Sequence, residues 1–200
     1  MRILIDIGHP AHVHYFRNFA RIMQEKGHQI YFTTVEKEFE PYLLEKYGFA
    51  FKKIRKHRKG MLGKIFELIR TDFRLWFYSL KIRPDIFLGA GSISASHVAF
   101  LMRKPFIQLE DTGNMEQIRL YRPFTTLILT PDVFHKDLGK KQFRYKGYQE
   151  LCYMHPKYFK PDPEIFKHLG IKKGEKYFIL RFISWHASHD FGLKGITLQQ

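Results

Sequence analysis

The chain of 200 residues is 44% hydrophobic, which suffices for one buried core or for one domain and part of another. It has no run of eighteen apolar residues, and its first residues are too short and too acidic for a secretory leader, so neither a spanning helix nor a signal peptide is expected. The single cysteine, Cys152, excludes an internal disulfide and indicates a reducing cytoplasm.

The charge balance is strongly basic. Lys and Arg number 34 against 19 Asp and Glu, which gives a net charge of +15 and a pI near 9.8. Such a charge favours anionic partners, namely nucleic acid, acidic lipid headgroups or phosphorylated substrates. Aromatic residues make up 16% of the chain, which suits both a membrane interface and single-stranded RNA, so composition does not choose between them.

Short apolar runs alternate with amphipathic stretches of helix length, a pattern typical of a parallel sheet flanked by helices. Strands are predicted over residues 2–7, 29–35, 50–54, 86–88, 106–109 and 127–130. Helices are predicted over residues 14–26, 38–47, 61–82, 92–102 and 115–121. The predicted fold class is therefore α/β, with a Rossmann-like parallel sheet in residues 1–131.

The character of the chain changes after this predicted sheet. Residues 132–162 are rich in Lys, Tyr, Pro and Gly and show little periodicity apart from a short strand near 143–145, so they are predicted to form an interdomain linker. A helix over 163–169 and a buried strand over 176–183 follow. One strand and one helix cannot bury a core, so residues 163–200 are predicted either to begin a second, truncated domain or to dock onto something else.

The loop after the first predicted strand contains Gly8, His9, His12 and His14. Ligands of open α/β sheets bind at the carboxyl ends of the strands, and a helix N-terminus there favours phosphate or another anion. A histidine in this loop titrates near neutrality and can act as a general base on a hydroxyl. Alternatively, His12 and His14 only cap and pack. The crowded spacing and the lack of a supporting cysteine disfavour a zinc site.

Two glycines and a serine follow the fourth predicted strand. Gly89 and Gly91 let backbone amides approach a ligand, and Ser92 can cap the next helix. The pattern is not a full dinucleotide-binding motif and lacks the lysine of a P-loop, so a tight turn with close helix packing is an equal alternative.

Adjacent carboxylates follow the fifth predicted strand. Glu110 and Asp111, with Thr112 beside them, suggest acid/base chemistry or binding of a substrate hydroxyl. The alternative is that Asp111 or Thr112 only caps the next helix. The enzyme interpretation requires that His9, Gly91 and Asp111 meet at one edge of the sheet.

A basic segment leads into the longest predicted helix. Residues 51–64 hold seven Lys or Arg and no acid, and the helix over 61–82 places its large apolar residues within about one third of its circumference. A core-facing helix after a solvated loop explains this stripe. Leu68 and Leu75 lie on the far side, however, and a cationic loop beside surplus apolar surface is also what contact with an anionic membrane through residues 51–82 requires.

The last polar segment lies near residue 190. Trp185, His186, His189 and Asp190 follow the predicted strand closely, which is unusual for a mere connection and suggests substrate contact. The spacing does not decide their roles.

Three segments resemble a known family: ILIDIGHPAHVHYFRNF at 3–19, PFTTLILTP at 123–131 and RFISWHASHDFG at 181–192. They resemble bacterial and archaeal proteins classed as a domain of unknown function. That family belongs to the GT-B glycosyltransferase superfamily, beside UDP-N-acetylglucosamine 2-epimerases and the lipid-intermediate transferase of peptidoglycan synthesis. The resemblance runs along the whole chain, and it implies a second Rossmann-like domain beyond residue 200.

The resemblance also implies a function. In such enzymes the C-terminal domain mainly holds a nucleotide-sugar donor, the N-terminal domain mainly holds the acceptor, and no metal or other cofactor is bound. A histidine or carboxylate of an N-terminal loop often acts as base, which makes His9 the first candidate. Glu110 and Asp111 loosely resemble the acidic residues after the corresponding epimerase strand.

The leading hypothesis is a nucleotide-sugar-dependent glycosyltransferase of surface-polysaccharide or glycolipid synthesis. Its acceptor would be a saccharide or a lipid-linked molecule, and its location the cytoplasm or the inner face of the membrane. The alternatives are a UDP-N-acetylglucosamine 2-epimerase-like enzyme and a basic binding protein without catalysis. A nucleic-acid-binding module is disfavoured because the basic run lies in one loop and no recognition motif is present.

Overall fold

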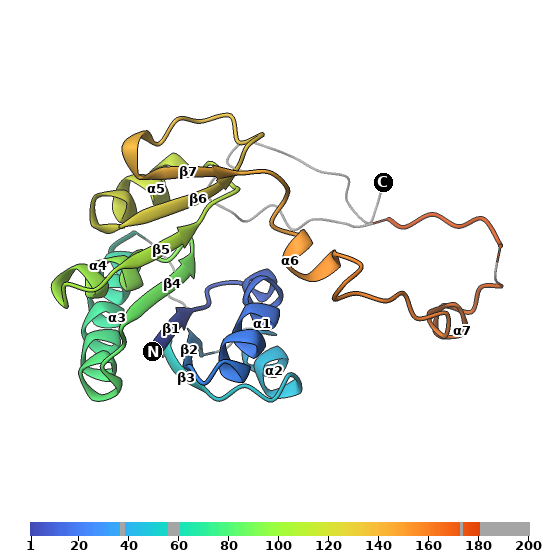
Figure 1. The fold of residues 1–200 in the computed structure, drawn as a ribbon, viewed down its shortest axis with the longest axis horizontal. Coiled ribbons are helices and arrows are strands. Elements are labelled where there is room, and N and C mark those ends of the chain that lie inside the picture. The colour runs from blue at the N-terminus through green and yellow to red at the C-terminus, as the bar shows by residue number, and fades with distance from the viewer. Residues whose placement is uncertain (37–38, 56–60, 173, 181–200) are drawn as a thin grey trace. The chain divides into compact units, whose positions relative to one another are not determined.

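The computed structural model of the protein describes residues 1–36, 39–55, 61–172 and 174–180. The chain divides into two compact units, Met1–Lys160 and Pro161–Gln200. The first unit contains a parallel sheet and six α-helices among its described residues (Figure 1). The described residues of the second unit contain one short helix, α7 (Ile165–Leu169), which ends at Gly170 in the left-handed conformation.

The sheet has seven strands, all parallel, in the order β3-β2-β1-β4-β5-β6-β7. The bounds are β1 (Arg2–Asp6), β2 (Gln29–Val35), β3 (Phe51–Arg55), β4 (Ile86–Ala90), β5 (Phe106–Leu109), β6 (Leu127–Pro131) and β7 (Gln142–Tyr145). The strand order reverses between β1 and β4, which is where open α/β sheets form a crevice at the carboxyl ends of their strands. The predicted Rossmann-like α/β class is confirmed.

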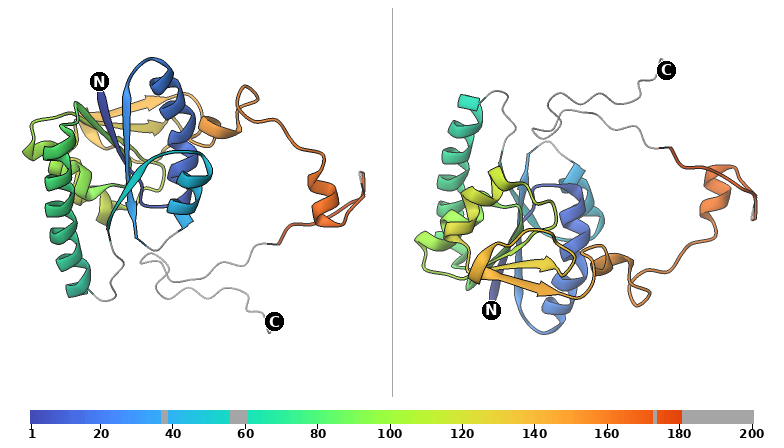
Figure 2. Two further views of the ribbon diagram at one scale, coloured as in Figure 1. Left: turned by 90° about the horizontal axis from the view of Figure 1, so that it is seen from below. Right: turned by 90° about the horizontal axis from the view of Figure 1, so that it is seen from above.

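Helices cover both faces of the sheet (Figure 2). The α-helices of the first unit are α1 (Pro10–Glu25), α2 (Phe39–Lys46), α3 (Met61–Ile82), α4 (Ile93–Leu101), α5 (Met115–Tyr121) and α6 (Leu151–Met154). One core cluster joins α1 and α2 to the sheet through residues such as Ile5, Phe16 and Leu44. A second cluster joins α3 and α4 to the opposite face, with Leu75 and Phe87 at its centre. This two-sided burial explains why the inner strands are apolar runs.

The start of α1 differs from the prediction. The helix begins at Pro10, well before the predicted start at residue 14, because the His9 side chain caps it by accepting a hydrogen bond from the Ala11 N–H. Pro10 fits the first turn, where its missing N–H removes no helical hydrogen bond. The loop between β1 and α1 is therefore shorter than predicted, and His12 and His14 lie on the helix.

The sheet continues into the range predicted to be an interdomain linker. Within residues 132–162, β7 pairs with β6, and Asp132 N–H donates to Tyr145 O at 2.9 Å. Residues 142–145 therefore belong to the sheet. The assignment of residues 163–200 to the start of a second domain stays a prediction.

The strand predicted over 176–183 is not found in its described part. Residues 176–180 form no strand, and Phe178 is 93% exposed. A strand needs a neighbour for its N–H and C=O groups, and none pairs with these residues in the part of the chain that the structure describes. Residues 181–183 lie outside that part.

The apolar stripe of α3 faces outward, whereas the core-facing prediction placed it against the sheet. Phe73 and Phe77 of the stripe are 55% and 63% exposed, whereas Leu75 on the far side is 0% exposed and packs in the second core cluster. Thr71 and Ser79 are also buried on that side. These short side chains allow α3 to pack closely against α4.

This orientation predicts unequal effects of two substitutions on α3. Leu75→Ala is expected to lower the free energy of unfolding by about 2–5 kcal/mol, because it leaves a cavity in the core. Phe73→Ala is expected to change it by about 0.5 kcal/mol or less, because the ring is exposed. Urea denaturation monitored by circular dichroism measures both values. A loss for Phe73→Ala equal to or larger than that for Leu75→Ala would contradict this orientation.

Candidate active site

Three loops leave the carboxyl edge of the sheet on the two sides of the strand-order reversal. They follow β1, β4 and β5, and they contain every predicted site residue that the structure describes except Gly89, which lies in β4, and His12 and His14, which lie on α1. Hydrogen bonds between their residues and those of adjoining elements join the three loops. The geometry that the enzyme interpretation required is therefore present.

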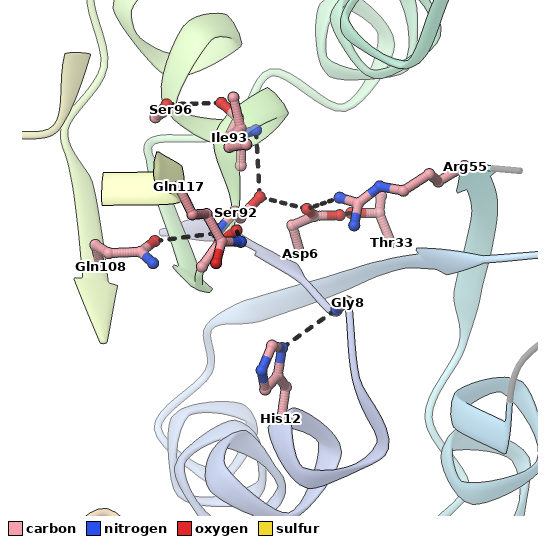
Figure 3. A network of polar contacts seen from close by, with 12 residues as sticks. Asp6, Gly8, His12, Thr33, Arg55, Ser92, Ile93, Ser96, Gln108 and Gln117 are labelled. Atoms are coloured by element: carbon pink, nitrogen blue, oxygen red, sulfur yellow. Dashed lines mark hydrogen bonds and ion pairs between the residues drawn. The ribbon is translucent and has the colours of Figure 1, made fainter. Parts of the chain in front are cut away.

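Asp6 at the end of β1 is the centre of this edge (Figure 3). Its buried carboxylate accepts a hydrogen bond from the Thr33 hydroxyl at 2.7 Å. It also forms an ion pair with Arg55, whose Nη2 lies 2.7 Å away. The hydroxyl of Ser92 also donates to it. These partners come from β2, β3 and the start of α4, so one carboxylate fixes the positions of four elements.

Gly89 and Ser92 close the gap between β4 and β1. A Cβ at Gly89 would lie 2.7 Å from the Ser92 Cβ, so only glycine allows this turn to pack so closely. Ser92 caps α4 through the Ala95 N–H, and its own N–H donates to Gln108 Oε1 at 3.4 Å. The observed contacts of both residues position the loop, and their predicted contact with a substrate stays a prediction.

Gly91 connects the second loop to the third. It has φ of +63°, and its carbonyl accepts a hydrogen bond from the Gln117 side-chain amide on α5. A Cβ at Gly91 would lie 2.7 Å from Gln117 Nε2, so a side chain there would push α5 away. The left-handed backbone and the close contact both favour glycine.

His9 lies at the exposed turn between β1 and α1. Its Nδ1 accepts the Ala11 N–H at 3.2 Å, so the proton of the neutral ring is on Nε2. In this conformation the ring can donate a hydrogen bond to an anion or a hydroxyl. Proton transfer to His9 requires the bond to Ala11 to break.

His12 is the half-buried histidine that faces the turn at Gly8. Its Nδ1 accepts the Gly8 N–H at 3.3 Å, and its ring stacks on Tyr15. Burial, with the nearby charges of His9 and Arg55, lowers the pKa of His12 to about 3. The ring is therefore neutral at physiological pH and holds the turn at Gly8.

His14 points away from the loop toward an aromatic cluster. Its ring centroid lies 5.4 Å from that of Tyr153 and 5.9 Å from that of Tyr47. Burial and the Arg17 charge lower the pKa of His14. The structure does not bring His14 to the three loops.

Glu110 anchors the loop after β5. Its Oε1 accepts hydrogen bonds at 2.8 Å from the Thr112 N–H, the Thr112 hydroxyl and the Gly113 N–H, and its Oε2 accepts one at 2.5 Å from the Tyr121 hydroxyl. The carboxylate is buried. This set of donors indicates that Glu110 holds the loop and does not transfer protons. The hydroxyl of Thr112 is one of these donors, so it too holds the loop.

Asp111 is the carboxylate that faces outward. Its Oδ2 accepts the Tyr15 hydroxyl at 3.3 Å, which joins the third loop to α1. In the amide orientation that satisfies both groups, Gln149 Nε2 donates to Asp111 at 3.1 Å, and its oxygen accepts the Glu110 N–H at 3.1 Å. Partial burial and the charges of Glu110 and Glu150 raise the pKa of Asp111, against the opposing effect of the Tyr15 hydrogen bond.

Sequence reasoning missed four residues of this site: Asp6, Arg55, Tyr15 and Gln149. The signal for Asp6 was present, because a carboxylate in a buried strand must be paired. Arg55 was counted only as part of the basic run. Nothing local pointed to Tyr15 or Gln149, because their partners are distant in sequence. Trp185, His186, His189 and Asp190 lie outside the described residues.

Two further findings concern the described residues only. No group of three or more His, Cys, Asp or Glu side chains among them is arranged to hold a metal ion. In the same residues, no helix has the length and apolar character that crossing a bilayer requires.

Comparison with known proteins gives one family. The family described as "Protein of unknown function (DUF354)" matches residues 1–192. An uncharacterised protein of Methanocaldococcus jannaschii, MJ0665, is 25% identical over 188 residues, which cover 90% of this chain and 55% of that protein. The UDP-N-acetylglucosamine–N-acetylmuramyl-(pentapeptide) pyrophosphoryl-undecaprenol N-acetylglucosamine transferase of Buchnera aphidicola is 30% identical over 116 residues, 52% of this chain and 32% of that protein.

Solved structures share the fold. MurG of Acinetobacter baumannii has a TM-score of 0.57 at 16% identity, over 74% of this chain and 46% of its own. A UDP-N-acetylglucosamine 2-epimerase has a TM-score of 0.54 at 15% identity, over 72% of this chain and 47% of its own. The first unit therefore has the fold found in GT-B glycosyltransferases and these epimerases. The chain spans 55% of the first relative, about half its length.

The low pKa of His12 predicts a pH dependence of stability. Below its ordinary pKa of 6.5 the unfolded chain protonates this ring, but the folded protein does so only near 3, so stability is lost as the pH falls through this window. His12→Asn keeps an acceptor for the Gly8 N–H and is expected to make the urea midpoint less dependent on pH between about 6.5 and 3.

His97 provides a control of opposite sign. Its hydrogen bond to Asp72 at 2.8 Å raises its pKa, so its contribution is complete below 6.5 and is lost as the pH rises through the folded value. His97→Asn should therefore lower the free energy of unfolding at acid pH, where the protonated ring pairs with Asp72. An unchanged pH slope in His12→Asn would contradict the neutral state of His12.

Proposed function

The chain belongs to the DUF354 family, and from this we propose that it forms the acceptor-side part of a nucleotide-sugar-dependent glycosyltransferase of the GT-B type. One observation carries the proposal: three loops of a GT-B-like sheet are hydrogen-bonded together at the edge where the strand order reverses. Ligands of such sheets bind at this edge. The activity belongs to the whole protein, since the chain spans about half of its first relative.

The proposed donor is a nucleotide sugar, and the proposed acceptor is a saccharide or a lipid-linked molecule. The names of the Buchnera transferase and of the structurally similar epimerase both include UDP-N-acetylglucosamine, and the transferase name includes an undecaprenol acceptor. Surface-polysaccharide or glycolipid synthesis in the cytoplasm or at the inner membrane face is the proposed setting. No metal or other cofactor is part of the proposal.

Proton transfer is assigned to His9 and Asp111 at the carboxyl edge of the sheet. His9 offers its Nε2–H to a bound anion or hydroxyl, and it can take a proton once the cap at Ala11 opens. Asp111 has an outward carboxylate whose raised pKa moves it closer to neutral pH, as a general base requires. Substrate contact by Trp185, His186, His189 and Asp190, which lie outside the described residues, stays a prediction.

An epimerase is the second candidate function, because the fold is shared equally with a UDP-N-acetylglucosamine 2-epimerase. An epimerase acts on the donor alone and needs no acceptor. Incubating the full-length protein with UDP-N-acetylglucosamine and recording NMR spectra separates the two functions. A new sugar-nucleotide signal without any acceptor would assign the epimerase reaction.

A conservative substitution tests the role of His9. Asparagine is a good helix N-cap, so His9→Asn keeps the cap on α1 while it removes the imidazole. Turnover of a nucleotide sugar by the full-length protein is expected to fall by about 10²–10⁴-fold, the usual contribution of a general acid or base. The urea midpoint should stay close to that of the unchanged protein.

His14→Asn is the matched control, because His14 lies on the same helix but faces the tyrosine cluster. Its turnover is expected to stay unchanged. If His9→Asn also turns over at the original rate, His9 has no part in the reaction and Asp111 remains the candidate base.

A further inference from the structure

The outer side of α3 carries an unusual row of exposed apolar side chains. Its members are between 47% and 63% exposed: Ile65, Ile69, Phe73, Phe77 and Leu80. From helical geometry they fall within about one third of the circumference and extend over about 22 Å of the axis. We call them the α3 apolar face. Contiguous exposed apolar surface of this kind marks an interaction site.

Among the described residues of α3, the cations next to this face lie along one side of it. Arg70, Arg74 and Lys81 follow the flank of α3 that is turned toward the edge strand β3, by the same helical geometry. Arg74 is fixed there, because its Nη1 donates to Ile54 O of β3 at 3.1 Å. Asp72 lies on the other flank and is paired with His97.

A cationic groove lies between α3 and β3. This open cavity of about 800 Å³ is lined by Lys52, Lys53, Arg74 and Lys81, and Glu36 is the one carboxylate among the described residues of its lining. Phe77 belongs both to the groove and to the α3 apolar face. The groove and the face are therefore one continuous surface with a cationic part and an apolar part.

We propose that this surface docks on the anionic face of a lipid bilayer. In this arrangement α3 lies in the plane of the membrane, the apolar face enters the acyl boundary, and the groove takes the phosphate groups of acidic lipids. An amphipathic helix with cations beside its apolar side is the structure that binds such interfaces. The net charge of +15 adds long-range attraction to the same partner.

Charge disfavours a second copy of the chain as the occupant. In a symmetric dimer the same patch of each subunit meets its counterpart, so the cations of both grooves would be brought together. The aliphatic residues Ile65, Ile69 and Leu80 also disfavour nucleic acid, because single-stranded nucleic acid binds by stacking on aromatic rings.

The surface is separate from the three loops of the candidate active site, so lipid docking does not depend on sugar transfer. The two are connected through β3, where Lys52 and Lys53 precede Arg55, the ion-pair partner of Asp6. Docking through β3 and α3 would hold the site next to a lipid-linked acceptor. This consequence rests on the proposed function, whereas the docking itself does not.

Sedimentation with lipid vesicles tests the proposal. The protein is mixed with vesicles of phosphatidylcholine alone or of phosphatidylcholine with phosphatidylglycerol, at low and high salt. Binding is expected only to the anionic vesicles and is expected to weaken as salt rises. Lys52→Glu with Lys53→Glu, and separately Phe73→Ser with Phe77→Ser, should each reduce it by about ten-fold or more.

Matched controls use exposed residues elsewhere on the first unit. Phe143→Ser changes an aromatic ring of similar exposure on β7, and Lys26→Glu with Lys46→Glu reverses two exposed charges on the α1 and α2 side of the sheet. Both controls are expected to bind like the unchanged protein. Every variant is expected to stay folded, because all substituted side chains are exposed. Urea denaturation checks that lost binding does not reflect unfolding.

Three results would overturn the proposal. The first is no binding to anionic vesicles, or binding that the α3 and groove variants leave unchanged. The second is tight binding to a single-stranded oligonucleotide without vesicle binding, which would assign the groove to nucleic acid. The third is concentration-dependent dimerisation, measured by sedimentation velocity, that Phe73→Ser with Phe77→Ser abolishes without vesicle binding. Loss of turnover in His9→Asn with intact vesicle binding concerns the active site alone.

Discussion

The structure depends on how one buried carboxylate is paired. Asp6 ends the interior strand β1, and a charge in that position is tolerated only when hydrogen bonds and an opposite charge replace water. Thr33, Arg55 and Ser92 supply them from three other elements. Removing one partner of such a pair typically costs about 3–5 kcal/mol, so the arrangement of β1, β2, β3 and α4 at this edge is firmly specified.

This pairing divides the polar residues of the edge into two groups. Ser92 and Glu110 use their oxygens on neighbouring protein groups, so they define the shape of the loops. His9 and Asp111 stand at the rim, where one ring nitrogen and an outward carboxylate can still meet a ligand. A polar residue after a strand is therefore not by itself a catalytic group; its partners decide which role it has.

Helix α3 shows a second division, between its two sides. The side with Thr71, Leu75 and Ser79 packs on the sheet, and the side with Phe73 and Phe77 faces outward. The stripe carries large apolar side chains that the core of the fold does not bury. The cations gather on the flank of the stripe nearest β3, so the excess hydrophobicity and the excess positive charge of the chain meet on one surface.

Local patterns determined most of the secondary structure. The bounds of β2, β5 and α3 follow directly from apolar periodicity, because side-chain alternation and helical repeat are properties of adjacent residues. The alternation of strands and helices likewise indicated a parallel sheet, and the family resemblance identified the fold. The sequence also located the loops that hold His9, Gly91 and Asp111.

The tertiary structure decided what those elements do together. The strand order brings the three loops to one edge, the choice of core-facing side exposes the stripe of α3, and distant partners such as Tyr15 and Gln149 enclose Asp111. These outcomes depend on contacts between residues far apart in the chain. Periodicity reports which residues share a side of an element, but only packing against other elements determines which side is buried.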